Sequence, residues 1–255
     1  MNVSNLTVRD ELVEINGSKI FTKLYGVDKK KITIVMDAGY GDYSKAWDTL
    51  IPDLAEIANV FVYDRPGLGK SEKSSTPRTS LEMIKELNEV LLMLHIKPPY
   101  ILVGHSFGGV NMRLFATRFP IEVAGMVLID STPEEYRERF LPTMSSQFQE
   151  AYNKQFIYEG TYDEFMESLS QLRQEKSHLG NLNLTIISAG NKAHYSKESQ
   201  DLWNEMQKEM LSISNNSEFV IAENSAHYIQ YDEPLIVVKA IKKLINKLNH
   251  DSNLD

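Results

Sequence analysis

The amino-acid sequence predicts an α/β fold with a mostly parallel central sheet, helices on both of its faces and one helical insertion. Two observations predict this class. Short apolar runs of strand length alternate with longer segments of helical apolar spacing, and the alternation stops between residues 131 and 181. Strands separated by helices imply right-handed crossovers and parallel pairing. We therefore expect an α/β core at residues 1–130 and 182–255, with residues 131–181 as the insertion.

The expected elements follow in chain order. Residues 11–15 and 19–25 should form a hairpin, because Asn16-Gly17 between them favours the tight turn that joins antiparallel strands. Further strands are expected at residues 31–36, 60–63, 100–103, 123–129, 184–188 and 218–222. Helices are expected at residues 44–57, 80–96, 110–119, 197–211 and 234–248.

The insertion is a charged, helix-prone segment without a strand-like run, and aromatic side chains are spread along it. These aromatics could form an apolar pocket wall, but we expect roughly two thirds of them only to pack the insertion against the core.

Composition limits the function classes. A net charge of -8 argues against a nucleic-acid binder and against a surface that seeks anionic membranes. The chain has no cysteine, which excludes disulfides, thiolate chemistry and zinc–sulfur sites. No apolar run approaches the ~18 residues of a membrane span, and the first residues lack the apolar centre of a signal peptide. A soluble, cytoplasmic protein with a small-molecule substrate is the default expectation.

A candidate nucleophile lies where the apolar run 100–103 meets the next helix. Gly104-His105-Ser106-Phe107-Gly108 is a G-x-S-x-G pattern in a strand–turn–helix setting, which is typical of a nucleophile elbow. Glycines two residues before and after Ser106 let the strand and helix backbones pass closely. The alternative is a glycine-rich turn with no chemical role, so the remaining parts of a serine site must be sought elsewhere.

A serine hydroxyl needs a base, usually a histidine. We expect His227, which follows the last strand, to be that base, because loops at the carboxyl ends of parallel strands share one edge of a sheet. His105 should point away from Ser106, and His194 is a weaker candidate. The other histidines, His95, His178 and His250, fall in helix-like or tail segments.

The carboxylate that orients the base should come from a strand end between Ser106 and His227 in sequence. We expect Asp130, which directly follows the run 123–129. Glu198 and Asp201, beyond the strand at 184–188, remain the alternatives. Two backbone N–H groups should form an oxyanion hole: that of Phe107, after the nucleophile, and that of Tyr40, in the loop Gly39-Tyr40-Gly41.

These motifs resemble the α/β-hydrolase superfamily over nearly the whole chain. The resemblance is carried by Gly104-His105-Ser106-Phe107-Gly108-Gly109, by the loop Asp64-Arg65-Pro66-Gly67-Leu68-Gly69-Lys70-Ser71, and by Ser225-Ala226-His227-Tyr228. It implies that residues 131–181 are a lid over the active site. The family's usual His-Gly pair in the oxyanion loop is Ala38-Gly39 here, and its usual acid after the penultimate strand is missing. Asp130 matches the variant that carries the acid one strand earlier.

The expected activity is hydrolysis of a carboxylic ester, thioester or lactone through an acyl-enzyme on Ser106. Serine at the elbow argues against the dehalogenases and epoxide hydrolases of the superfamily, which use a carboxylate. The alternatives are the same residues acting as an aminopeptidase, carbon–carbon hydrolase or perhydrolase, and a non-catalytic ligand-binding protein. Gly67-Leu68-Gly69-Lys70-Ser71 lacks the first glycine of a phosphate-binding loop. No metal or other cofactor is expected, and the oligomeric state is left open.

Overall fold

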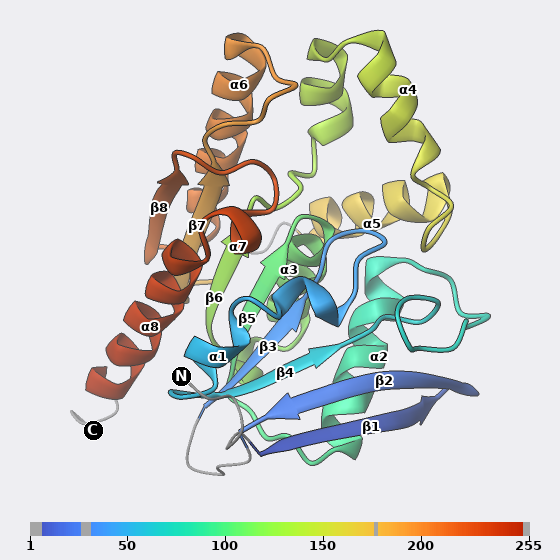
Figure 1. Cartoon of the computed structure of the whole chain (residues 1–255), viewed down its shortest axis with the longest axis vertical. Coiled ribbons are helices and arrows are strands. Elements are labelled where there is room, and N and C mark those ends of the chain that lie inside the picture. The colour runs from blue at the N-terminus through green and yellow to red at the C-terminus, as the bar shows by residue number, and fades with distance from the viewer. Residues whose placement is uncertain (1–6, 27–31, 176–177, 252–255) are drawn as a thin grey trace.

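An eight-stranded sheet forms the centre of the computed structural model, which describes residues 7–26, 32–175 and 178–251 (Figure 1). The strand order is β1-β2-β4-β3-β5-β6-β7-β8. The strands β3 to β8 pair in parallel, and the β1–β2 hairpin joins the sheet antiparallel through β2 and β4. The strands are β1 Val8–Ile15, β2 Ser18–Tyr25, β3 Thr33–Asp37, β4 Asn59–Tyr63, β5 Tyr100–His105, β6 Val123–Ile129, β7 Asn183–Ala189 and β8 Ser217–Ala222. The predicted fold class is confirmed.

The hairpin turn shows why the sequence signal was reliable. Asn16 and Gly17 both adopt positive φ angles, 50° and 76°, as a two-residue turn matched to the strand twist requires. The inner strands β3, β4 and β5 are buried along their whole length, as expected for parallel strands covered on both faces. Side chains of the outer strand β1 are mostly exposed or half-buried.

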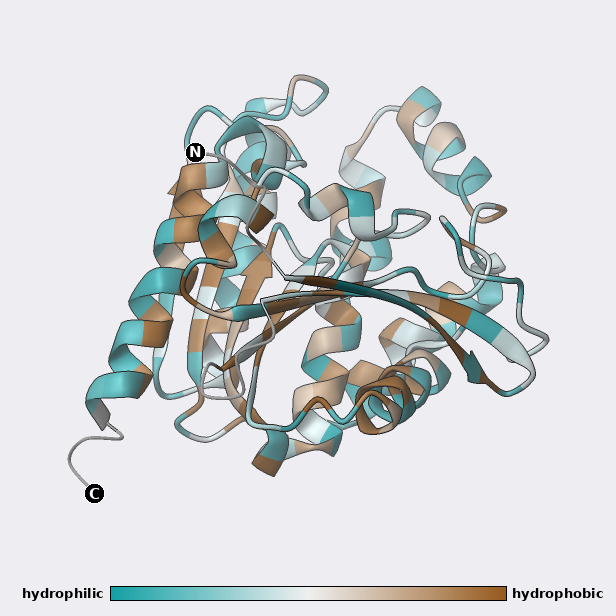
Figure 2. Cartoon of the chain, turned by 60° about the horizontal axis from the view of Figure 1, so that its bottom comes forward, coloured by the Kyte–Doolittle hydropathy of each residue, from teal (hydrophilic) through white to brown (hydrophobic). Residues whose placement is uncertain are grey.

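Helices cover both faces of the sheet. On one face, α2 (Ser80–Met93), α3 (Phe107–Arg118) and α5 (Tyr162–Glu175) contribute to one hydrophobic cluster. On the other, α1 (Ile51–Leu54) and α8 (Pro234–Asp251) contribute to a second. Figure 2 shows hydrophobic colour along the central strands and alternating hydrophobic and hydrophilic segments along the helices. The helices α2, α3 and α8 thus pack hydrophobic side chains against the sheet.

The predicted helix at residues 44–57 is wrong as a continuous element. The segment forms the 3₁₀ turn η2 (Ser44–Trp47) and the short helix α1. Pro52 at the start of α1 has no N–H to donate, and its ring excludes the helical carbonyl four residues earlier, so one helix cannot run through it. A short helix that the sequence did not predict, α7 (Ile229–Asp232), follows the loop that carries His227.

The described part of the insertion contains the one-turn π-helix η4 (Tyr136–Phe140), the 3₁₀ turn η5 (Leu141–Thr143), α4 (Ser146–Lys154) and α5. A third hydrophobic cluster joins the first part of the insertion to α6 (Lys197–Glu209). It consists of Tyr136, Phe140, Leu141, Met144, Trp203 and Met206. In Figure 1, α4 lies beyond the upper ends of the strands and α6 runs from there down beside β7, whereas α5 packs with α2 and α3. The assignment of residues 131–181 as a helical lid over the active site stays a prediction.

The remaining elements are the 3₁₀ turns η3 (Pro120–Glu122) and η6 (Met210–Ile213). Within the described ranges of the chain, no helix combines the length and the apolar character that crossing a membrane requires.

Candidate active site

The carboxyl ends of the parallel strands gather the candidate site at one edge of the sheet. Ser106 follows β5, Asp130 follows β6, and His227 lies in the loop after β8. The loop 38–41 follows β3, so four strand ends contribute to the same edge. The parallel pairing therefore brings Ser106 and His227, which are 121 positions apart in the sequence, to the same edge of the sheet.

Ser106 occupies a strained turn between β5 and α3. Its φ and ψ angles are 52° and -118°, a conformation that residues with a side chain rarely adopt. The tight crossing depends on its glycines: a Cβ on Gly104 would lie 2.6 Å from the Gly108 carbonyl oxygen, and one on Gly108 would overlap the Asp37 carbonyl. The Ser106 N–H donates to the Ile129 carbonyl over 3.0 Å. The geometry is that of a nucleophile elbow.

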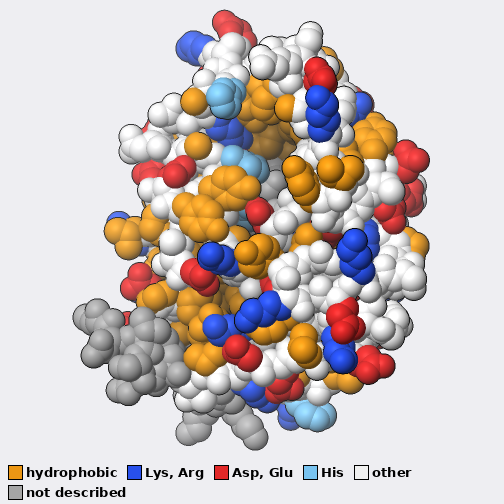
Figure 3. Space-filling model, turned by 45° about the vertical axis from the view of Figure 1, so that its right-hand side comes forward, with side chains coloured by type: hydrophobic (Ala, Val, Ile, Leu, Met, Phe, Trp, Pro, Cys, Tyr) orange, Lys and Arg blue, Asp and Glu red, His pale blue; other side chains and the backbone are white. Residues whose placement is uncertain are grey.

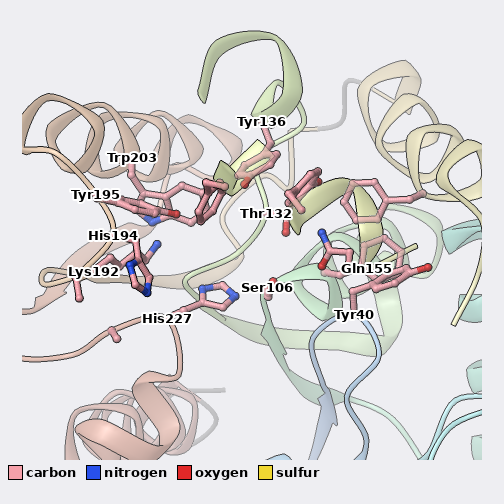
Figure 4. A pocket seen from close by; sticks show the side chains of 16 residues that line it. Tyr40, Ser106, Thr132, Tyr136, Gln155, Lys192, His194, Tyr195, Trp203 and His227 are labelled. Carbon is pink, nitrogen blue, oxygen red and sulfur yellow. The ribbon is translucent and has the colours of Figure 1, made fainter. Parts of the chain in front are cut away.

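Asp130 and His227 meet directly. Nδ1 of His227 lies 2.6 Å from Oδ2 of Asp130, whose side chain is fully buried. The other oxygen, Oδ1, accepts the Ala189 N–H over 3.0 Å and the Trp203 indole N–H over 2.7 Å. In Figure 4 the His227 ring points towards Ser106. The charged Asp130 carboxylate accepts a hydrogen bond from Nδ1 and so fixes the ring proton on that nitrogen. The unprotonated Nε2 is then the nitrogen that faces Ser106.

The backbone around His227 is held from two sides. Buried His105 has Nε2 2.9 Å from the His227 carbonyl, to which a protonated Nε2 donates. Burial lowers the pKa of His105 to about 3, so its ring is neutral near pH 7. From the other side, Oδ2 of Asp232 accepts the Ala226 N–H over 2.9 Å. His105 thus holds the loop that carries His227, and its exclusion from proton transfer stays a prediction.

The alternative acids lie elsewhere. Glu198 and Asp201 are exposed on α6, and Asp201 pairs with Lys197 on the same helix. His194 is exposed, although it lines the cavity described below. The structure thus brings Asp130, and neither of the two alternatives, to His227.

Two residues at this site were not predicted from the sequence. Lys192, in the loop after β7, places its buried ammonium 2.6 Å from Oδ2 of Asp130 and 3.5 Å from the centre of the Trp203 ring. The indole N–H of Trp203 therefore donates to Asp130, and the face of the same ring lies against the Lys192 ammonium. A lysine in a loop and an aromatic residue at a helical spacing are common in sequences. Only the three-dimensional packing therefore distinguishes Lys192 and Trp203 from ordinary loop and core residues.

The loop expected to form the oxyanion hole is fixed from beneath by Arg65. Its buried guanidinium donates to the carbonyls of Ala38 and Gly39 over 2.8 and 2.7 Å and also contacts the Asp37 carboxylate. The Gly39 carbonyl and the Tyr40 N–H belong to one trans peptide unit and point in opposite directions, so the contact of this carbonyl with Arg65 turns the Tyr40 N–H away from Arg65. The second expected donor, the Phe107 N–H, is at the first residue of α3, where no intrahelical partner exists and the helix dipole favours negative charge.

The insertion is bound to the same loop. Glu159 pairs with Arg65 through two contacts, of 2.5 Å to Nε and 2.9 Å to Nη2, and accepts the Gly41 N–H over 3.1 Å. Its carboxylate is completely buried. The Tyr40 hydroxyl donates to the Gly160 carbonyl over 2.5 Å and accepts the Gly160 N–H over 2.9 Å. No local pattern in the sequence predicts this connection between the insertion and the loop.

A cavity of about 390 Å³ opens beside Ser106 (Figure 4). Its wall is mostly aromatic and includes Tyr40, Phe107, Tyr136, Phe148, Tyr152, Phe165, Tyr195 and Trp203. Both the insertion and the core supply these side chains. Figure 3 shows a hollow between hydrophobic side chains on one face of the molecule, with histidine side chains at its edge. The cavity volume is at the small end of the range for small-molecule sites.

The glycine-rich loop after β4 is closed by its own side chains. Asp64 accepts the Lys70 N–H over 2.8 Å and the Ser44 N–H over 2.9 Å, and the Ser71 hydroxyl donates to the Asp64 carbonyl. A carboxylate in the centre of the loop is incompatible with a phosphate there. Among the described residues, no group of three or more potential metal ligands is close enough to hold an ion.

Comparison with known proteins agrees with this architecture. A sequence profile of the family described as alpha/beta hydrolase fold matches residues 32–163. The uncharacterized protein YqjL of Bacillus subtilis (strain 168) is 37% identical over 211 residues, which are 82% of each chain. This chain belongs to the α/β-hydrolase family. A second family relative, an AB hydrolase superfamily protein of Gibberella zeae, is 21% identical over 93% of this chain and 96% of its own.

Solved structures share the α/β-hydrolase fold. MGS-M2, an alpha/beta hydrolase enzyme from a Medee basin deep-sea metagenome library, has a TM-score of 0.67 at 16% identity and covers 92% of this chain and 97% of its own. The epoxide hydrolase CorEH has a TM-score of 0.68 at 18% identity and covers 95% of this chain and 100% of its own. At these identities the likeness shows the fold. Family membership and the hydrolase neighbours together support a hydrolase.

Proposed function

We propose that this α/β-hydrolase family member is a serine hydrolase that cleaves a carboxylic ester of a small, partly apolar substrate. The observation that carries the proposal is the 2.6 Å contact between Asp130 and His227 beside a serine on a strained elbow. A buried carboxylate saturated by donors on both oxygens is the group that holds a histidine in the tautomer needed for a general base.

The mechanism follows from the roles of these groups. Nε2 of His227 takes the proton of the Ser106 hydroxyl as Oγ attacks the substrate carbonyl carbon, and the imidazolium formed is stabilised by Asp130. The Tyr40 and Phe107 N–H groups bind the oxyanion. His227 then protonates the leaving alcohol, and the same steps with water release the acid and restore Ser106.

The cavity supports an ester with a compact apolar group. Its volume of about 390 Å³ and aromatic wall suit a short acyl chain or a single ring. A thioester or lactone of this size fits the same chemistry. The N-terminus of a peptide would need an anionic partner, and the Asp130 carboxylate of this site is already paired on both of its oxygens.

Labelling with a fluorophosphonate probe tests the proposal. We expect stoichiometric labelling of the wild-type protein, no labelling of Ser106→Ala, and turnover of short p-nitrophenyl esters without aminopeptidase activity. Hydrolysis of an aminoacyl substrate in place of esters would support the same residues acting on a different bond. Absence of labelling on well-folded protein would leave only a ligand-binding role on this scaffold.

A further inference from the structure

Lys192 is a buried cation that the mechanism above does not use. Its ammonium and Nδ1 of His227 both lie 2.6 Å from the same oxygen, Oδ2 of Asp130. The lysine side chain is only 6% exposed, and its ammonium also faces the Trp203 ring. Asp130 thus has two donors on Oδ1 and two nitrogen partners on Oδ2. Two groups that can each carry a positive charge share one oxygen.

We propose that Lys192 is a positioning residue for the acid–base pair, whose charge holds Asp130 and lowers the pH at which His227 becomes able to act as the base. The proposal rests on the proposed function, because it assigns Lys192 an effect on the same histidine. A positive charge a few ångströms from an imidazole disfavours the imidazolium, whereas the Asp130 carboxylate favours it. The lysine therefore weakens, without removing, the effect of Asp130.

The charge of Lys192 is itself sensitive to pH. Burial lowers its pKa to about 8, although Asp130 opposes the shift. Burial lowers the pKa of His105 and raises the pKa of Tyr136 and of Tyr195, so these three side chains of the cluster stay neutral. The Asp42 carboxyl also interacts with His227; burial raises the Asp42 pKa, and the His227 ring opposes that shift. His194, exposed on the Lys192 loop, lines the same cavity. When Lys192 loses its proton, Asp130 stabilises the imidazolium of the transition state more strongly, so reactivity should rise again.

The rate of fluorophosphonate labelling of Ser106 between pH 5 and 9 tests the proposal without a known substrate. For the wild type we expect the labelling rate to rise once as His227 loses its proton, and a second time near pH 8 as Lys192 loses its proton. In Lys192→Met the first rise should move to higher pH by about one unit and the second should vanish. Lys192→Arg keeps its charge over this range, so its first rise should stay in place while the second vanishes. The difference between wild type and K192M should persist in a His194→Gln background.

Lys197→Met is the matched control, because Lys197 is a lysine of the next helix whose side chain is 82% exposed. Its profile should equal that of the wild type. An unchanged profile in K192M, with only a lower Tm, would overturn the proposal and leave Lys192 a purely structural role. If K192M fails to fold, K192R decides: a second rise that persists near pH 8 overturns the proposal. Wild-type protein that is never labelled overturns the proposed function and this inference together, whereas labelled protein with unchanged profiles overturns only the inference.

Discussion

Two buried aspartates lie on either side of β5, the strand that leads to Ser106: Asp37 at the end of β3 and Asp130 after β6. Asp37 is held by Arg65 and by the Asn111 amide, which donates over 2.8 Å. Asp130 is held by two neutral donors, by Lys192 and by His227, which faces the cavity. One aspartate is enclosed by scaffold groups, and the other has a histidine partner that lines the cavity.

Their acidities differ in direction. Burial raises the pKa of Asp37, and Arg65 and Asn111 offset only part of that effect. Burial also acts on Asp130, but the charge of Lys192 and the hydrogen bond from His227 outweigh it and hold the Asp130 pKa below its usual range. Burial alone therefore does not define an acid's role. The charge and the accessibility of its partners do.

Of the two aspartates, Asp130 is the one whose substitution should have the larger effect. Asp130→Asn should lower kcat by a factor of about 10⁴, because an amide leaves His227 in the wrong tautomer and removes the charge that stabilises the imidazolium. Steady-state ester hydrolysis, with circular dichroism to check folding, measures the effect. Glu198→Gln and Asp201→Asn should retain nearly the wild-type rate. A near-normal rate in Asp130→Asn with either control inactive would reassign the acid.

At the other aspartate the expected effect is on stability. Arg65→Met leaves the buried carboxylates of Asp37 and Glu159 without their shared cation, and we expect a loss of about 3–5 kcal/mol in the free energy of unfolding. Urea denaturation gives this value. Lys154→Met, which breaks an exposed pair with Glu150, should cost about 0–1 kcal/mol. Equal losses of unfolding free energy in Arg65→Met and Lys154→Met would show that the ion pairs of Arg65 with Asp37 and Glu159 do not support the fold.

Glu159 contacts both Arg65 and the loop expected to form the oxyanion hole. Of the three substitutions, that of Glu159 should have the smallest effect. Glu159→Gln keeps an oxygen for the Gly41 N–H but loses the charge that pairs with Arg65, so the oxyanion loop is held less firmly. We expect kcat to fall by about tenfold with KM nearly unchanged, less than the 10²–10³ that follows loss of a whole oxyanion donor. Glu167→Gln, at an exposed position of α5, is the control for a charge change in the insertion. A rise in KM at constant kcat would instead mean that Glu159 acts on substrate binding.

Much of the scaffold could be predicted because its signals are local. Residues 123–129 were predicted as a strand and are β6, and the Asn16-Gly17 turn required only its own two residues. Ser106, Asp130 and His227 were found from position, since each directly follows a strand or lies in the loop beyond one. The structure brings these three together, and their catalytic roles stay proposals.

The parts that were missed depend on contacts between distant residues. Glu159 and Arg65 are 94 positions apart, and neither has neighbours that mark it as a partner. Lys192 and Trp203 meet Asp130 only because β6 and β7 are adjacent and α6 folds back over their ends. The interrupted helix at residues 44–57 is different, because Pro52 was visible in the sequence and its effect on an internal helical turn was underweighted.

The backbone at the site has a consequence for folding itself. Ser106 and Asp130 both adopt positive φ, 52° and 43°, and neither is a glycine. A residue held in such a conformation costs on the order of 1–3 kcal/mol, which the surrounding packing must supply. Glycine at position 106 would relieve the strain at the elbow, whereas the proposed function requires the hydroxyl of Ser106. On that proposal, stability and activity compete at this turn of the chain.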